Sequence, residues 1–499
     1  DPNRVKGKIN YSVWSDVLRC PHCGNEMVFW DVAVVNNKKK TLKVFNCPKC
    51  KSLLSKSPPK DSGALRVERV TETILDRALG KTIKIARQVP VMINYSVGKR
   101  RYEKKIDHAD LDLIKEINDY KSPYPFPTDM LPYGYNTGQP IVSHGFTHVH
   151  HFFTKRNLYV LATFVHKIYL KNHPLLLTFL DMLSRASKRN RYMPEYGNRH
   201  VGVLSGTLYI PTLSEESNII NSFKFRLSKL GKGGKFKNQY LIETKSSTSF
   251  SKIENIDYVF VDPPFGGNLM YSELNFIDES WLKIFTNKTD EAIINDPQEK
   301  GINQYQKLIE ECFSTFYDSL KPNRWITIEF HNSQNAIWNS IQEAVIQCKF
   351  VVADVRTLDK KKGTTKQLSY SNATRQDLII SAYKPSVKFE QEFSIKGGTV
   401  QGAWDFILQH LEQLPMPSKV GGRIEIQSER TPYLLYDRML AFHLVRGLTI
   451  PLSAGEFYQG LSKGSFLMRE GMVFTIPQAA EYDRLRLSAE GVQQLSLFV

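Results

Sequence analysis

The sequence predicts an α/β fold, and three observations support this prediction. From residue 239 onward, short apolar runs alternate with amphipathic stretches, as strand–helix–strand units do. Those apolar runs are nearly continuous, which is typical of parallel strands that are covered on both faces. The 499 residues are 41% hydrophobic and 23% charged, an ordinary composition with enough apolar material for a core. A chain of this length and composition predicts about two to four domains.

Four of the six cysteines form two CxxC pairs near the N-terminus, Cys20 with Cys23 and Cys47 with Cys50. Two such pairs, about two dozen residues apart, predict a ribbon in which four thiolates hold one structural zinc ion. The residues between the pairs predict a β-hairpin, and Gly24 suits the tight backbone after the first pair. Two disulfides are the alternative, which an intracellular location disfavours. We therefore expect a zinc ribbon over residues 1–60.

The net charge of +17 is unevenly distributed along the chain. The first 250 residues contain 41 of the 67 basic residues but only 20 of the 50 acidic ones. This excess predicts that residues 61–238 contact a polyanion such as nucleic acid, with a solvated lysine-rich surface as the alternative. The chain has no apolar run long enough for a transmembrane helix and no signal peptide, so we expect a cytoplasmic location and no membrane partner.

Within residues 61–238 the pattern predicts helices over HADLDLIKEINDY and after Thr154, an irregular loop over SPYPFPTDMLPYGYNTGQP, and strand structure over NRHVGVLSGTLYIP. Thr154 is expected to be the N-cap of its helix. Lys155 and Arg156 would then oppose the helix dipole, which is tolerable if an anion lies nearby. For His148, His150 and His151 we favour packing or a DNA-facing surface over metal binding, because the sequence indicates no third ligand.

Residues 239–386 predict the sheet itself. Strands are expected over QYLIET, YVFVDPPF, WITIEFHNS, FVVADVRTL and DLIISAYKP, with helices over NQYQKLIEECFSTFYDSLKP (stopped by Pro322) and AIWNSIQEAVIQCKF. Only a loop separates the last two strands, so they should form an antiparallel pair. Residues 387–499 predict a mainly helical accessory domain with a short strand pair near GMVFTIP.

The most informative stretch is the one in which a buried strand runs directly into Asp262, Pro263, Pro264 and Phe265. In a doubly wound sheet, ligands bind beyond the carboxyl ends of the strands. Prolines at such an end stop the strand and stiffen the turn. The Asp262 carboxylate and the Pro263 carbonyl would then be two acceptors beside an aromatic ring. This set suits the exocyclic amino group of a planar base.

These four residues resemble the (D/N/S)PP(Y/F/W) motif of amino-methylating DNA methyltransferases. The zinc ribbon and the stretches GKINYSVWSDV, THVHHFFTKRNL, SGTLYIP and ERTPYLLYDRMLAFHLVRG also resemble bacterial adenine-specific DNA methyltransferases of restriction and phage-defence type. The resemblance covers most of the chain and is most specific at the tetrapeptide. It implies a Rossmann-like class I methyltransferase core, of which residues 239–386 would be the half with strands 3–7.

The resemblance also implies the chemistry. S-adenosylmethionine would be the cofactor, duplex DNA the partner, and a flipped adenine the base methylated at N6, for which Asp at the first motif position is typical. The resemblance gives the catalytic role to the tetrapeptide. It places Asp262, Phe265 and Glu243 near the cofactor. Residues that could form the base pocket are Tyr271, Glu329, His331 and Asn332.

The family's glycine-rich FxGxG loop, which cradles the cofactor, has no counterpart in this sequence. We therefore expect that a preceding segment or a separate subunit supplies that half, and a restriction nuclease is a further possible partner. The alternatives are an RNA or cytosine-N4 methyltransferase, and a catalytically incomplete module that only binds DNA. An RNA enzyme would prefer single strands or hairpins over duplex.

Overall fold

The computed structural model describes residues 7–35, 40–169, 174–196, 201–230, 241–248, 253–331, 334–359, 376–420, 423–463 and 465–489. The chain forms a mixed α/β structure of two compact units. Unit 1 comprises residues 1–241 and 270–286, and unit 2 comprises residues 242–269 and 287–499. The return of residues 270–286 to unit 1 is a feature that the sequence pattern does not predict. No helix in the described ranges is both long and apolar enough to cross a bilayer.

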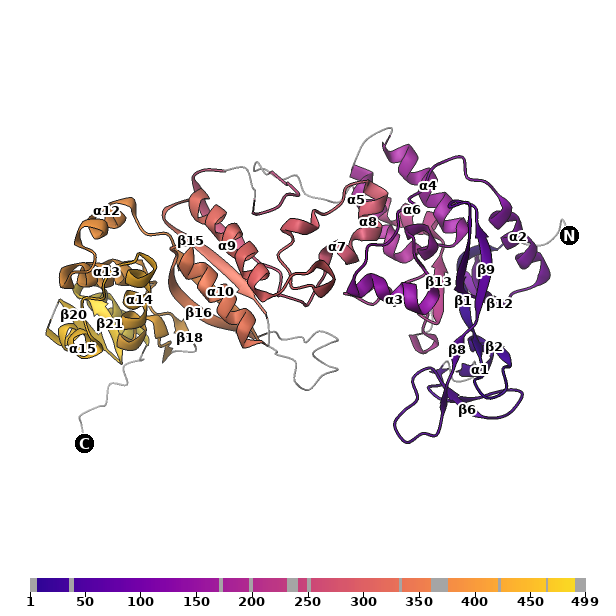
Figure 1. The fold of residues 1–499 in the computed structure, drawn as a ribbon, viewed down its shortest axis with the longest axis horizontal. Helices are drawn as coiled ribbons and strands as arrows, with labels where there is room; N and C mark the ends of the chain where they lie inside the picture. Colours follow the sequence, from indigo (N-terminus) through magenta and orange to yellow (C-terminus); the bar gives the residue numbers. More distant parts are fainter. Residues whose placement is uncertain are drawn as a thin grey trace, which may run out of the picture. The chain divides into compact units, whose positions relative to one another are not determined.

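Unit 1 is organised around a long antiparallel sheet (Figure 1). The central strand β1 (Lys8–Arg19) lies between β11 (Gln88–Val97) and β13 (Leu213–Ser217), and β12 (Arg100–Lys105) pairs with β11. The far end of β1 pairs instead with β2 (Glu26–Val28) and β8 (Glu68–Arg69), which leads into the cysteine-rich region. A separate hairpin is formed by β9 (Thr71–Asp76) and β10 (Lys81–Ala86).

The cysteine-rich region differs from the single hairpin that the sequence predicts. One helical turn, α1 (Phe29–Ala33), interrupts the expected first strand, because Phe29 and Ala33 both turn into the local core. The remaining strands are short: β3 (Val34–Val35) pairs with β4 (Lys40–Thr41), and β5 (Phe45–Asn46) with β6 (Leu53–Ser55), which also pairs with β7 (Leu65–Arg66).

The helices described in unit 1 are α2 (His108–Asp119), α3 (Tyr135–His144), α4 (Lys155–Tyr169), α5 (Pro174–Ala186), α6 (Ile219–Leu230), α7 (Tyr271–Leu274) and α8 (Phe276–Leu282), besides α1. Figure 1 shows α4, α5, α6 and α8 gathered together. The Trp281 ring of α8 lies 5.5 Å from the Phe179 ring of α5, so residues 270–286 complete this helical core.

Two predictions for unit 1 are wrong in their boundaries. Helix α3 begins inside the stretch predicted to be an irregular loop. Residues 201–210 contain no strand; the strand of this region is β13, a few residues later, where all five side chains are buried between β1 and the helices. The helices α2 and α4 lie where the sequence predicts them.

Unit 2 contains a four-stranded sheet of order β14-β15-β17-β16. The strands are β14 (Ile256–Val261), β15 (Leu320–Phe330), β16 (Val351–Asp359) and β17 (Gln376–Tyr383). β14 and β15 are parallel, and β17 is antiparallel to both of its neighbours, as predicted for the last strand pair. The strand expected over QYLIET is wrong: residues 241–246 are irregular and mostly exposed.

Helices cover both faces of this sheet. α9 (Ile302–Ser319) and α10 (Asn335–Gln347) pack on the face formed by Ile326, Ile328 and Phe330 (Figure 1). α9 ends at Ser319, before Pro322 is reached. Pro322 lies in the irregular start of β15, so it is not the residue at which the helix ends. On the other face, Trp325 and Tyr383 contact the C-terminal helices.

The C-terminal part of unit 2 is mainly helical, as predicted. Its helices are α12 (Val387–Lys396), α13 (Val400–Gln413), α14 (Pro432–Val445), α15 (Ala454–Lys463) and α16 (Ile476–Ala489). Its short strand pairs are β18 (Lys419–Val420) with β19 (Arg423–Ile424), and β20 (Phe466–Arg469) with β21 (Met472–Thr475).

Candidate functional site

The predicted tetrapeptide lies at the carboxyl end of a parallel strand pair. β14 ends at Val261, which pairs with Ile328 two residues before β15 ends. Because β17 runs the opposite way, its first residues, including Asp377, lie at the same edge. Asp262 is exposed immediately after β14, and the two prolines are half-buried. The structure therefore gathers residues from three strands at one edge of the sheet.

The turn after the prolines is held by hydrogen bonds to one carbonyl. The Tyr305 hydroxyl of α9 donates to the Pro264 oxygen over 2.8 Å, and the Gly266 amide donates to it over 3.0 Å. Gly266 has φ +64°, and a Cβ there would lie 2.6 Å from Cδ1 of Ile337. The positive φ favours glycine, and a larger residue would also have to displace the end of the Ile337 side chain. Burial raises the pKa of Tyr305 well above its usual value, so this hydroxyl remains a donor at neutral pH.

The aromatic ring of the tetrapeptide packs across the end of β15. The ring centroid of Phe265 lies 5.3 Å from that of Phe330, edge to face, and 6.1 Å from that of His331. His331 Nδ1 in turn lies 2.6 Å from a carboxylate oxygen of Asp377, which is fully buried. His331 thus lies between the motif ring and a buried acid.

This arrangement leaves one backbone acceptor available at the edge. The Pro264 oxygen is occupied by Tyr305 and Gly266, whereas in the described part of the chain no donor bonds to the Pro263 oxygen. An exposed carboxylate and an adjacent carbonyl can together accept both hydrogens of an amino group.

The other predicted site residues have different positions. Glu329 is half-buried on β15, at the same edge as His331. Glu243 is exposed in an irregular segment, so the strand end on which its predicted cofactor role rested does not exist. Tyr271 begins α7 and belongs to unit 1, not to the unit that contains the tetrapeptide. Asn332 lies outside the described residues.

The four paired cysteines lie together in unit 1, and their sulfur atoms are all within 4.8 Å of one another. Sγ of Cys20 lies 3.7 Å from Sγ of Cys50, and Sγ of Cys23 lies 3.7 Å from Sγ of Cys47. These separations exclude disulfides, in which the sulfurs are about 2.05 Å apart. They match the edge of a tetrahedron with Zn–S bonds of about 2.3 Å, which is about 3.8 Å long. The cluster could therefore bind a structural metal such as zinc.

Two equivalent backbone turns position these sulfurs. The Cys20 amide donates to the Asn25 oxygen, and the Gly24 amide returns to the Cys20 oxygen. In the second turn the Cys47 amide donates to the Ser52 oxygen, and the Lys51 amide returns to the Cys47 oxygen. Each turn directs two sulfurs toward one point, as a four-thiolate site requires.

His148, His150 and His151 are buried, as packing predicts, and do not form a surface that faces DNA. Nε2 of His150 and Nε2 of His151 lie 2.7 Å and 2.8 Å from the same carboxylate oxygen of Asp76, at the end of β9. Although burial alone would raise it, the hydrogen bonds from His151 and His150 lower the pKa of Asp76 well below its usual range. Asp76 is thus the partner that the sequence could not indicate.

Proximity alone would allow Asp76, His150 and His151 to hold a metal ion. The hydrogen bonds of His151 argue against it. The amides of Thr147 and His148 donate to His151 Nδ1 over 3.2 Å and 3.3 Å, so Nδ1 is an acceptor and the ring proton lies on Nε2. A ligating histidine needs the opposite arrangement, with its remaining N–H donated away from the metal. We therefore interpret the cluster as a hydrogen-bonded His–Asp–His group.

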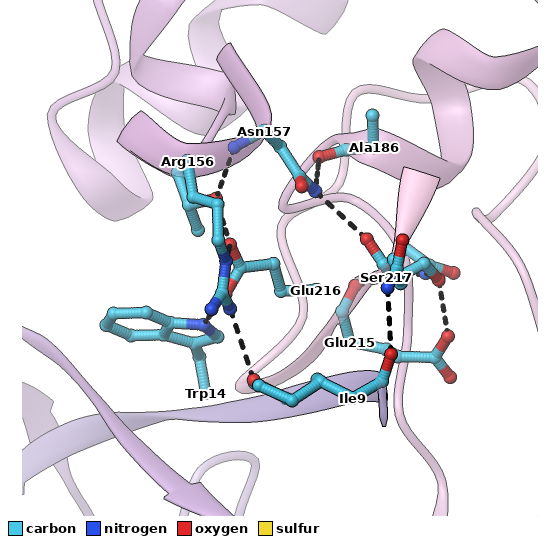
Figure 2. A network of polar contacts seen from close by, with 12 residues as sticks. Ile9, Trp14, Arg156, Asn157, Ala186, Glu215, Glu216 and Ser217 are labelled. Carbon is cyan, nitrogen blue, oxygen red and sulfur yellow. Dashed lines mark hydrogen bonds and ion pairs between the residues drawn. The ribbon is translucent and has the colours of Figure 1, made fainter. Parts of the chain in front are cut away.

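A buried carboxylate also pairs with Arg156, one of the two basic residues in the first turn of α4. Glu216 of β13 accepts hydrogen bonds from Trp14, from Thr154 and, through two nitrogens, from Arg156 (Figure 2). Glu216 is thus an anion near the helix N-terminus, the condition under which basic residues in the first turn are tolerable. Thr154 caps α4 as expected, since its hydroxyl accepts from the Asn157 amide.

Sequence reasoning missed Tyr305, Asp377, Asp76 and Glu216 as partners of these sites. Each comes from an element distant in sequence from the residue that it contacts, so no local spacing marks it.

Comparison with protein-family models gives no match for this chain, and a search of curated proteins gives no related sequence.

Proposed function

We propose that this chain is the base-recognising part of an S-adenosylmethionine-dependent DNA methyltransferase that acts on the N6 amino group of adenine. The observation that supports this most is the position of Asp262 and Pro263 after a parallel strand, with the Phe265 ring packed beside them. The Pro264 oxygen is tied to Tyr305, which leaves the Pro263 oxygen as the backbone acceptor next to the carboxylate.

These residues would act on the amino group of a base turned out of the duplex. Hydrogen bonds from the two amino hydrogens to the Asp262 carboxylate and the Pro263 carbonyl would orient the group. They would also raise the electron density on its nitrogen, which makes it a better nucleophile. Phe265 would provide an apolar face for stacking, and its contacts with Phe330 and His331 fix that face.

The strand order supports the proposal further. A sheet of order β14-β15-β17-β16, with β17 antiparallel between its neighbours, resembles the second half of the class I methyltransferase sheet. Among the described residues no strand pairs with the outer edge of β14, and on one of its faces Tyr258 and Phe260 are 54% and 56% exposed. An open edge with exposed aromatic side chains is where another strand would add.

The described residues contain no strand beyond β14, on the side where the first half of such a sheet would lie. We infer that a further segment or subunit adds to the β14 edge and provides the S-adenosylmethionine site. Duplex DNA would contact the basic unit 1, whose fold the four-cysteine site stabilises. The resemblance to restriction enzymes also makes a nuclease a candidate partner.

The experiment that tests the proposal measures transfer of a radiolabelled methyl group from S-adenosylmethionine to mixed-sequence duplex DNA. The chain is compared with Asp262→Ala and with Asp257→Ala, which removes an exposed acid from the other end of the same strand. With the segment or subunit that provides the cofactor site co-expressed, we expect label with the unchanged chain and with Asp257→Ala, and none with Asp262→Ala. Nucleoside analysis should find the label on adenine N6.

Other outcomes would favour the alternatives. Label on cytosine N4 or on RNA would replace the substrate in the proposal. Equal labelling by Asp262→Ala would refute the role of the tetrapeptide. Binding of duplex DNA with steep salt dependence, but without label in any sample, would indicate a module that binds DNA and lacks catalysis.

A further inference from the structure

Unit 1 contains a cavity of about 490 Å³ that no site described above uses. One wall is the face of the β9–β10 hairpin, where Glu72, Ile74 and Asp76 alternate along β9. The opposite wall is the first turn of α4, and the network of Glu216 in Figure 2 borders it. Helix α2 contributes Ile114 and Ile117. This volume is in the range of sites for small ligands.

Most charged groups in this cavity have a partner. Arg156 is bonded to Glu216, Arg77 to Asp119, and Asp76 to two histidines. Lys155 and Lys188 differ, because in the described part of the chain neither ammonium has a carboxylate within ion-pair distance. Lys188 Nζ lies over the Phe146 ring, 4.8 Å from its centroid.

The two lysines are held where a cation is costly. Burial lowers the pKa of Lys188 to about 8, and burial also lowers the pKa of Lys155. Lys155 is the first residue of α4, so the amino end of the helix adds positive potential at the same place. Both lysines are half-buried, so an anion bound in the cavity would compensate for the partial loss of their hydration.

The rest of the cavity suits a planar ring. Ile74, Ile83, Ile85 and the two isoleucines of α2 form an apolar surface, and Tyr159 of α4 adds an aromatic one. Glu72 pairs with no cation among the described residues, and it lines the cavity on the same strand face as Ile74. A carboxylate beside an apolar surface can accept a hydrogen bond from an amino group on such a ring.

We propose that this cavity binds a nucleotide, with its phosphate between Lys155 and Lys188 and its base against the isoleucines and Tyr159. Glu72 would accept a hydrogen bond from the base. This inference does not depend on the methyltransferase proposal, because every residue involved belongs to unit 1. The nucleotide could be one residue of a nucleic acid strand or a free mononucleotide, and the phosphate and base chemistry is the same in both.

The test uses isothermal titration of the full chain with deoxyadenosine monophosphate, with a short single-stranded oligonucleotide and with inorganic phosphate. Lys155→Met and Lys188→Met should each weaken binding of the nucleotide at least about tenfold, since a charge-assisted contact is lost. Lys167→Met removes the same charge from an exposed position on α4 and should leave binding unchanged. Lys188→Arg should restore most of the affinity.

If a lysine variant fails to fold, a variant that keeps all charges can still test whether the cavity binds the nucleotide. Ile114→Trp on α2 would fill the cavity from a half-exposed position and should abolish binding of the nucleotide. Affinity should also fall as the pH rises from 7 to 9, because Lys188 loses its proton over that range.

The outcomes distinguish the two possible sources of the nucleotide from results that would overturn the proposal. An oligonucleotide that binds tighter than the mononucleotide, and displaces it, assigns the cavity to a nucleic acid strand. A mononucleotide that the oligonucleotide does not displace indicates a free effector. No binding of either, equal affinity for inorganic phosphate, or equal binding by Lys188→Met and Lys167→Met would overturn the proposal.

Discussion

The hydroxyl of Tyr305 donates a hydrogen bond of 2.8 Å to the carbonyl oxygen of Pro264. The bond joins a helix to the turn of the candidate site, and Tyr305 itself is fully buried. It therefore fixes which of the two proline carbonyls is engaged inside the protein. In the described residues the adjacent Pro263 carbonyl accepts no hydrogen bond, and it is the one that we propose as an acceptor for the base.

Tyr305→Phe should loosen this turn without removing any group that contacts the ligand. Loss of one buried hydrogen bond should lower the free energy of unfolding by about 1 kcal/mol. If the proposed methyl transfer is observed, its rate should fall on the order of tenfold, because a displaced acceptor orients the amino group less well. Chemical denaturation and the labelling assay measure the two effects. An unchanged rate with reduced stability would show that Tyr305 only packs.

Removing one cysteine of the cluster should remove the metal. Cys47 is fully buried and would supply one of the four thiolate ligands. In Cys47→Ser the metal content should therefore fall from one zinc per chain to none. Structural zinc contributes about 10 kcal/mol or more of binding free energy in small zinc peptides, so unit 1 should unfold at a lower temperature. Atomic spectroscopy and thermal melting provide the measurements. Cys312→Ser is the control, because Cys312 lies on α9 outside the cluster and should keep the zinc.

The His–Asp–His group predicts that acid destabilises unit 1. Burial lowers the pKa of His151 to about 4, whereas the unfolded chain has the ordinary value of 6.5. Because the folded-state pKa is the lower one, the contribution of His151 is complete above pH 6.5 and is lost as the pH falls toward 4. We expect a loss of about 2 kcal/mol between pH 8 and pH 5 from this residue.

Urea unfolding at both pH values checks this prediction. In His151→Gln the difference between pH 8 and pH 5 should shrink by about 2 kcal/mol, since the titrating group is gone. His108→Gln changes an exposed histidine at the start of α2 and should behave like the unchanged chain. A difference that is equal in all three proteins would contradict the assignment.

Arg430 is a fully buried cation that is satisfied mainly by carbonyl groups. It donates to the backbone oxygens of Leu414 and Pro415 over 2.9 Å and 3.1 Å, and to the side-chain oxygens of Gln427 and Gln478. Arg430→Lys keeps the charge but loses the planar fork that reaches these acceptors. It should destabilise unit 2 by about 3 kcal/mol. Arg484→Lys, at an exposed position of α16, should cost almost nothing in the same denaturation experiment.

The sequence predicts well those features that depend on local spacing. The CxxC pairs, the Thr154 cap, the antiparallel last strands and the position of the tetrapeptide all follow from residues close together in the chain. The basic residues after the cap are tolerable if an anion lies nearby, and the structure places Glu216 beside Arg156. What the spacing could not give was the identity of that anion, because β13 follows α4 by dozens of residues.

The wrong predictions share a different cause. QYLIET has the composition of a buried strand, but in the described residues nothing covers it, and without burial a strand propensity has little effect. In the cysteine-rich region the alternation of MVFWDVAVV indicated one strand, yet burying both Phe29 and Ala33 required a helical turn. In both cases tertiary contacts decided between local conformations of similar energy.

The last prediction comes from the two equivalent cysteine turns. Gly24 and Lys51 occupy matching positions, and both have positive φ, 71° and 62°. Glycine adopts this conformation at little cost, whereas for a lysine it costs roughly 1 kcal/mol or more. Lys51→Gly should therefore stabilise the zinc-loaded protein by up to about 1 kcal/mol, partly offset by the greater freedom of the unfolded chain.

Gly24→Ala is the opposite change and should destabilise the protein by about 1 kcal/mol. A Cβ at residue 24 would have no atom within 4 Å, so steric overlap cannot account for the effect and backbone conformation alone is measured. Unfolding of both variants with zinc bound gives the comparison. If neither variant changes stability, the two turns do not hold their positive φ in solution. If only Gly24→Ala changes stability, the second turn accommodates Lys51 without measurable strain. The equivalence of the two turns is then limited to their hydrogen bonds.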